Sequence, residues 1–150
     1  ARLDVVLEEH VPFARWGNTA LVNTHGEVFR AAYDEGLPVF IGPDDAAREI
    51  VIQYRFFRRS LAAIGETPVE VKVSARRAWQ VKLESGTTLA LGRDNVEARL
   101  ARFVAVHERT LGRLGRPIDY VDLRYANGFA VRIPELRNEK PVSRRGQRTG

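Results

Sequence analysis

Two stretches of the chain repeat apolar residues at the spacing of an amphipathic helix. They cover residues 44–65 and 94–115, and in each the apolar residues recur three and four positions apart. Asp44 can cap the first helix. Asp94 and Glu97 have the spacing of a capping box at the start of the second. We therefore expect two helices, each of which packs on a core through one apolar stripe.

Apolar residues alternate with polar ones in most of the remaining chain, which predicts strands. The predicted strands cover residues 3–11, 20–22, 27–29, 37–41, 69–73, 79–83, 87–91, 118–125 and 129–133. Most consecutive strands are separated only by short turns, which favours hairpins. We therefore expect an α+β fold, a mostly antiparallel curved sheet of sequential hairpins with two amphipathic helices packed on it.

The last predicted hairpin is the first candidate for a binding surface. Its turn contains Asn127-Gly128, a pair that suits a type I′ turn. Its final strand, residues 129–133, is expected at a sheet edge, where unpaired N–H and C=O groups can accept a partner strand. Arg124 and Tyr125 belong to the residue types most enriched at interface hot spots. On the pattern alone, packing of one tyrosine in the core and the other on ordinary surface explains the hairpin equally well.

Two further segments combine arginine with aromatic residues. Arg76-Arg77 stands beside Trp79, and Phe13-Ala14-Arg15-Trp16 follows the first predicted strand. A solvated turn next to a core tryptophan explains the first segment. Packing of the first strand on the rest of the domain explains the second. Neither segment predicts a binding site without further support.

The chain has 150 residues, a net charge of +5 and no cysteine. This length fits one domain, and the absence of cysteine excludes thiolate metal sites and thiol nucleophiles. Residues 137–150 hold five basic residues and one acidic residue, so most of the net charge lies in a tail. Such a tail is typically disordered. It leaves open a second interpretation, a module that binds nucleic acid or an anionic surface through the tail.

The sequence contains no pattern typical of catalysis. His10, His25 and His107 have no second histidine or carboxylate at metal-ligand spacing. The serines occur in no nucleophile-elbow context, and no glycine-rich phosphate loop precedes a helix. We expect a protein that binds partners and does not catalyse a reaction, with no cofactor and no metal.

Several blocks of residues, in order, resemble a known protein family. The blocks are residues 11–16 (VPFARW), 21–29 (LVNTHGEVF), 75–81 (ARRAWQV), 91–93 (LGR), 99–104 (RLARFV) and 120–125 (YVDLRY). They resemble cell division protein FtsQ of Gram-negative bacteria. The resemblance reaches from about Leu3 to Val131. Its order and spacing make it specific, although each block alone is only modestly so.

The resemblance implies an architecture and a role. FtsQ proteins have a cytoplasmic tail, one membrane helix, a POTRA domain and a β domain. Residues 1–13 would then be the last strand of a truncated POTRA domain, residues 14–134 the β domain and residues 135–150 a basic, disordered tail. The protein would be a non-catalytic divisome scaffold at the periplasmic face of the inner membrane, at the division septum. It would bind FtsB together with FtsL and help control septal cell-wall synthesis.

The resemblance also implies a docking site. In the family, FtsB adds a strand to the edge formed by the last β-strand, near an arginine-containing turn. The matching positions in this chain are Arg76, Arg124, Tyr125, Asn127 and Gly128, with the edge strand Phe129, Ala130, Val131, Arg132 and Ile133. Asn127 and Phe129 stand where relatives can carry smaller residues.

Overall fold

A computed structural model of the chain describes residues 11–30, 36–109, 117–126 and 128–133. These residues form one sheet of nine strands and two α-helices. The strands are β1 (Pro12–Trp16), β2 (Ala20–Asn23), β3 (Val28–Phe29), β4 (Val39–Ile41), β5 (Pro68–Val73), β6 (Trp79–Leu83), β7 (Thr88–Gly92), β8 (Tyr120–Asp122) and β9 (Ala130–Arg132). The helices are α1 (Ala47–Ala62), preceded by a 3-10 turn at Asp44–Ala46, and α2 (Val96–Arg109).

The strands follow the order β3-β2-β1-β4-β5-β6-β7-β8-β9. Neighbours joined by short turns are antiparallel, which confirms the mostly antiparallel sheet. Three neighbouring pairs are parallel instead: β1 with β4, β4 with β5, and β7 with β8. Parallel neighbours need a long crossover, and α1 and α2 supply it for the last two pairs. The sheet is therefore mixed, with hairpins on either side of these parallel pairs.

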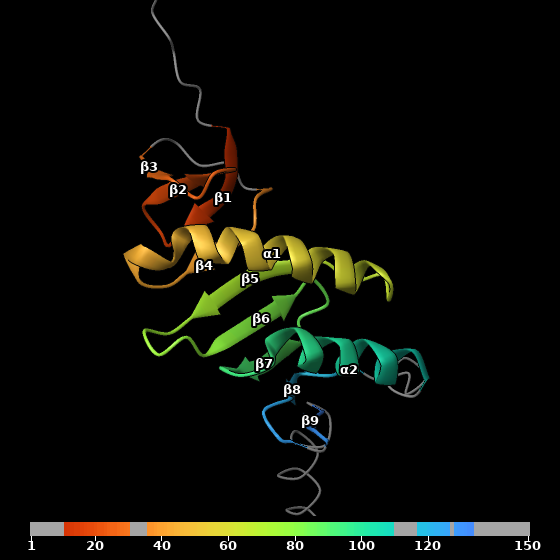
Figure 1. The fold of residues 1–150 in the computed structure, drawn as a ribbon. Helices are drawn as coiled ribbons and strands as arrows, with labels where there is room; N and C mark the ends of the chain where they lie inside the picture. Colours follow the sequence, from red (N-terminus) through yellow and green to blue (C-terminus); the bar gives the residue numbers. More distant parts are fainter. Residues whose placement is uncertain (1–10, 31–35, 110–116, 127, 134–150) are drawn as a thin grey trace, which may run out of the picture.

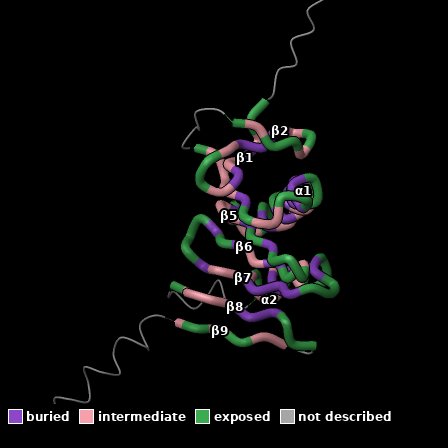
Figure 2. The backbone as a smooth tube through the Cα atoms, turned by 90° about the vertical axis from the view of Figure 1, so that its left-hand side faces the viewer, coloured by how far each residue is buried: buried purple, intermediate pink, exposed green. Residues whose placement is uncertain are grey.

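Both helices cover the same face of the sheet, and no helix of the described residues covers the opposite face (Figures 1 and 2). Phe40, Val71, Val81, Leu89 and Val121 are partners across five adjacent strands and are all fully buried. They form the buried face of the sheet, on which the helices pack. The α1 side chains Ile50, Phe57 and Leu61 and the α2 side chains Leu100 and Phe103 complete this core. The predicted α+β fold with two packed helices is confirmed.

The start of α1 differs from the prediction. Asp44 belongs to the 3-10 turn, and neither that turn nor α1 has a side-chain capping hydrogen bond. The neighbouring carboxylate of Asp45 lies 3.5 Å from Arg77 of the β5–β6 turn, which also binds Glu49 at 3.0 Å. The acidic start of α1 therefore anchors a turn of the sheet.

The last hairpin is less regular than the sequence predicts. β8 and β9 are shorter than the predicted strands, and their last pair is Asp122 with Ala130. The predicted strands reach Tyr125 and begin again at Phe129, so the pairing ends earlier than expected, and Asn127 of the predicted turn lies outside the described residues. Beyond Asp122 the backbone is bound by two side chains, Arg102 of α2 and Asp122 itself.

Some predicted segments lie outside the described residues. They include Asn127, the tail at residues 135–150, and all of the predicted POTRA strand except its end. Within the described part, Val11 precedes β1, whereas Pro12 and Phe13 are the first residues of β1 and so lie in the sheet.

Candidate protein-docking site

The predicted docking residues gather at one end and one edge of the sheet. β9 is the last strand in the order, and the structure describes no strand beyond it. The register places the β5–β6 turn, the end of β7 and the 123–129 loop at the same end of the sheet. Arg76 lies exposed in that turn, whereas Arg124 lies exposed in the loop, and β7 separates the two hairpins. The structure thus places both arginines at one end without bringing them into contact.

Arg124 is held by the residue two positions before it. Its Nε and Nη2 donate to Oδ1 and Oδ2 of Asp122 at 2.8 and 2.7 Å, and its backbone N–H donates to Oδ1 at 3.1 Å. Asp122 is buried, with 7% of its surface exposed. The hydrogen bonds from Arg124 lower the pKa of Asp122 against the opposing effect of burial. The carboxylate therefore stays ionised near neutral pH and orients the guanidinium.

Gly92, at the end of β7, makes room for this arrangement. Its φ of +74° favours glycine, and an added Cβ would lie 2.7 Å from Arg99 Nη1 and 3.0 Å from Arg124 Cγ. Arg99 Nη1 donates to the Leu91 carbonyl at 2.7 Å. The two arginines therefore pass close over a position that has no side chain.

Tyr125 is the largest exposed apolar residue of the loop. It is 54% exposed, and hydrogen bonding to it in the structure is through its backbone carbonyl, which accepts from Arg102. An exposed tyrosine next to an edge strand can anchor a partner, because aromatic residues bury a large area when they are covered. Its position fits the predicted anchor.

β9 itself alternates between the core and solvent. Phe129 and Val131 are partly buried and pack against the core, whereas Ala130 and Arg132 are exposed. Arg132 binds Asp119 at 3.2 Å and its guanidinium lies 4.8 Å from the centre of the Tyr120 ring. Arg132 is therefore engaged with β8 and its flank, and Ile133 follows it at intermediate burial. Gly128, with φ +137°, leads into the strand.

Sequence reasoning missed the residues that shape this loop. The sequence analysis assigns no site role to Asp122, Gly92, Arg99 or Arg102. The usable signal was Arg102, a cation between two core positions of the α2 stripe, Leu100 and Phe103. A charge that close to a buried face needs acceptors from a neighbouring element.

We predict that Asp122→Asn makes stability less sensitive to acid. Because the folded pKa of Asp122 is lowered, the carboxylate stabilises the fold at pH values above its unfolded pKa of about 3.9 and loses this effect as the pH falls through the folded value. Urea midpoints at pH 7 and pH 3 should therefore differ less for the variant than for the parent. Asp94→Asn, at an exposed position before α2, is the matched control. An unchanged acid dependence in Asp122→Asn would contradict the ionised Asp122–Arg124 pair.

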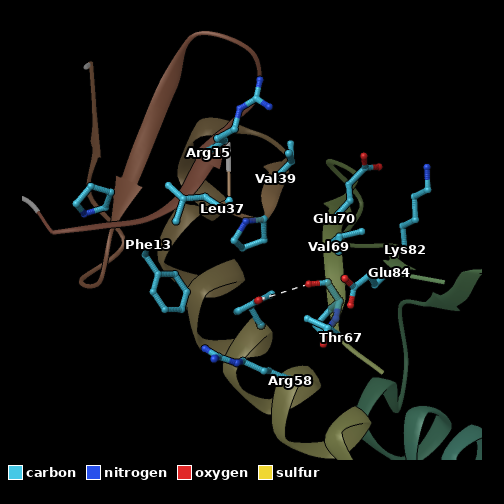
Figure 3. Close-up of a pocket in the computed structure, with 15 residues that line it drawn as sticks. Phe13, Arg15, Leu37, Val39, Arg58, Thr67, Val69, Glu70, Lys82 and Glu84 are labelled. Atoms are coloured by element: carbon cyan, nitrogen blue, oxygen red, sulfur yellow. Dashed lines mark hydrogen bonds between the residues drawn. The ribbon is translucent and has the colours of Figure 1, made fainter. Parts of the chain in front are cut away.

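A cleft of about 670 Å³ lies at the other end of β5, between β1 and the residues that begin β5 (Figure 3). Phe13 and Arg58 line one side, and Thr67, Glu70 and Glu84 line the other. Burial raises the pKa of Tyr54 in its wall, so this phenol stays neutral at pH 7. Its hydroxyl lies 3.4 Å from the Pro68 carbonyl. The cleft is separate from the docking edge, and the lining described here does not pair a nucleophile with a base.

The described residues contain neither a candidate metal site nor a helix that could span a membrane. No group of three or more histidine, aspartate or glutamate side chains is placed to hold a metal ion there. No helix in that part of the chain has the length and apolar character needed to cross a membrane.

Residues 14–124 match the family described as cell division protein FtsQ/DivIB, C-terminal. The chain belongs to the FtsQ/DivIB family. It is 49% identical over 130 residues to cell division protein FtsQ of Nitrosospira multiformis, a match that covers 87% of this chain and 55% of that protein. Matches to the FtsQ proteins of Burkholderia pseudomallei and Escherichia coli show 44% and 35% identity, covering 90% and 97% of this chain and 57% and 55% of those proteins.

The chain therefore spans a little more than half the length of these FtsQ relatives. The family match runs from within β1 to Arg124, so it takes in the sheet from β2 to β8 and both helices. This confirms the family resemblance found in the sequence and makes the chain part of a cell division protein.

Proposed function

We propose that this chain is a non-catalytic scaffold domain of the cell division machinery, and that it captures FtsB, together with FtsL, by adding a strand to β9. The observation that carries the proposal is the position of β9 at the edge of a nine-stranded sheet, beside an exposed tyrosine and an exposed arginine. A strand added to β9 would form backbone hydrogen bonds worth about 1 kcal/mol each. The side chains beside the edge would then select the partner.

The side chains beside the edge would contribute to binding in different ways. Tyr125 supplies exposed aromatic area, and Arg76 and Arg124 supply positive charge at the same end of the sheet. Because Asp122 already binds the Arg124 guanidinium through two of its nitrogens, the geometry of Arg124 is set before a partner arrives. Acidic residues of the partner would approach these arginines, which favours association at low salt.

The same proposal covers the whole protein. The chain would be the β domain of a longer protein with a POTRA domain and one membrane helix, at the periplasmic face of the inner membrane and the division septum. In that position the scaffold would help control septal cell-wall synthesis through FtsB and FtsL. The family match and the exposed edge support this role.

The test is hydrogen exchange on the 150-residue chain, with and without a saturating periplasmic segment of FtsB from the same organism. Strand addition should slow exchange of the outward amides in residues 129–133 and leave β3, at the opposite edge, unchanged. Binding that protects another region and not β9 would contradict the edge as the docking site. Binding that disappears when residues 135–150 are deleted, with a steep salt dependence, would favour the basic tail instead.

A further inference from the structure

We propose that Arg102 of α2 is a positioning residue. It orders residues 123–126, the docking loop, for binding of the partner strand, and this inference rests on the proposed function. Arg102 Nη1 donates to the Ala126 carbonyl at 3.1 Å, and its Nη2 donates to the carbonyls of Leu123 and Tyr125 at 3.2 and 3.1 Å. One side chain thus holds three backbone carbonyls within four consecutive residues. These residues include Arg124 and Tyr125, the proposed selectors of the partner.

The loop needs such a donor because its backbone no longer pairs with β9 beyond Asp122 in the described residues. The Leu123 N–H still donates to the Ala90 carbonyl of β7 at 2.9 Å, but the carbonyls that follow have no ladder partner on the β9 side. The planar guanidinium presents several N–H groups in a fixed fork, which matches carbonyls that converge from different directions. A lysine ammonium at position 102 would not reproduce this geometry.

The Arg102 guanidinium binds backbone carbonyls and no carboxylate of the described residues. No carboxylate of the described residues forms an ion pair with it, and its Nε is buried with no hydrogen-bond partner in the described part of the chain. Arg102 is partly buried, and a partly buried cation without a carboxylate needs other acceptors. The three carbonyls are those acceptors, so the side chain and the loop order each other.

Arg99 performs the equivalent task one strand away. It precedes Arg102 by three positions on the same helix, and it donates to the Leu91 carbonyl near the end of β7. α2 thus holds the ends of two adjacent strands through two arginines. Because both bind backbone carbonyls, they leave the side chains of Arg124 and Tyr125 exposed toward a partner.

The fraction of molecules in which the loop is ordered affects the apparent Kd for the partner. If the partner binds only the ordered loop, the apparent Kd equals the intrinsic Kd divided by the ordered fraction. We expect Arg102→Met, which keeps the apolar stem, to speed amide exchange of residues 124–126 in the free chain. A decrease in the ordered population to about one tenth raises the apparent Kd for the FtsB segment by about ten-fold. Arg102→Lys should give a smaller change of the same kind.

The experiment measures exchange rates in the free chain and Kd by titration with the FtsB segment, for the parent, Arg102→Met, Arg102→Lys and the control Arg109→Met. Arg109 is an exposed arginine at the end of the same helix and should change neither quantity. Faster loop exchange with a matching rise in Kd supports the proposal.

Three results would overturn it. A raised Kd with unchanged loop exchange means that Arg102 contacts the partner directly. Faster loop exchange with an unchanged Kd means that loop order does not matter for binding. Faster exchange throughout α2 and β7 means that Arg102 has a general structural role, because the hydrogen bonds of Arg102 go to residues 123–126 and not to β7. If the parent itself does not bind the FtsB segment, the proposed function fails, and the exchange rates still decide whether Arg102 orders the loop.

Discussion

Tyr125→Ala should weaken binding of the FtsB segment by about 2 kcal/mol, or about 30-fold in Kd, without unfolding the chain. The tyrosine is more than half exposed and borders the edge strand, so its aromatic area is available to a partner. Truncation removes little that the free domain uses, because the hydrogen bond found at this residue goes to its backbone carbonyl. Titration calorimetry with the periplasmic FtsB segment measures the change.

Ile52→Ala is the matched control for Tyr125→Ala. Ile52 is also a large exposed apolar residue, but it lies on α1, away from β9. Both variants should keep the circular dichroism spectrum and urea midpoint of the parent. Equal affinity of Tyr125→Ala and the parent, with both folded, would remove the tyrosine from the docking site.

Phe57→Ala should destabilise the fold by about 3–5 kcal/mol, which is a large part of the stability of an ordinary domain. Phe57 is fully buried on α1, and its ring lies edge-on to Trp79 of β6 with 5.9 Å between ring centres. Removing the ring leaves a cavity between helix and sheet that neighbouring side chains cannot fully fill. Urea unfolding followed by tryptophan fluorescence reports the loss directly.

The neighbouring residue gives an internal comparison. Phe56 lies next to Phe57 on α1 but is only partly buried. Phe56→Ala should therefore shift the urea midpoint clearly less than Phe57→Ala. Similar shifts for the two variants would contradict the placement of α1 against β6, because that placement alone distinguishes the two rings.

Local sequence patterns were sufficient to predict most of the helices and strands. The apolar stripe of residues 44–65 predicts α1, and alternation predicts β5 and β6 within one residue of their observed bounds. These signals are reliable because helical and extended backbones repeat their side-chain directions with fixed periods. The family resemblance added the proposed docking edge, since three of its blocks, residues 75–81, 99–104 and 120–125, lie in or beside β6, α2 and β8.

Local patterns failed where distant segments compete. Alternation predicts strands that reach Tyr125 and resume at Phe129, yet the pairing ends at Asp122 and Ala130. The competing interactions come from Arg124 and from Arg102, which binds the loop from a separate helix. Local strand preferences of well under a few kcal/mol do not outweigh several charge-assisted hydrogen bonds.

By itself, the sequence determined the α+β class, the two helices, most of the strands and the edge expected to receive a partner. Only the tertiary structure decided that β4 pairs in parallel with β5 and β7 with β8, and that Arg102 of α2 binds the backbone that follows β8. The reason is physical: periodicity encodes which face of an element is buried, whereas strand direction and the partners of a partly buried arginine depend on which elements meet in space.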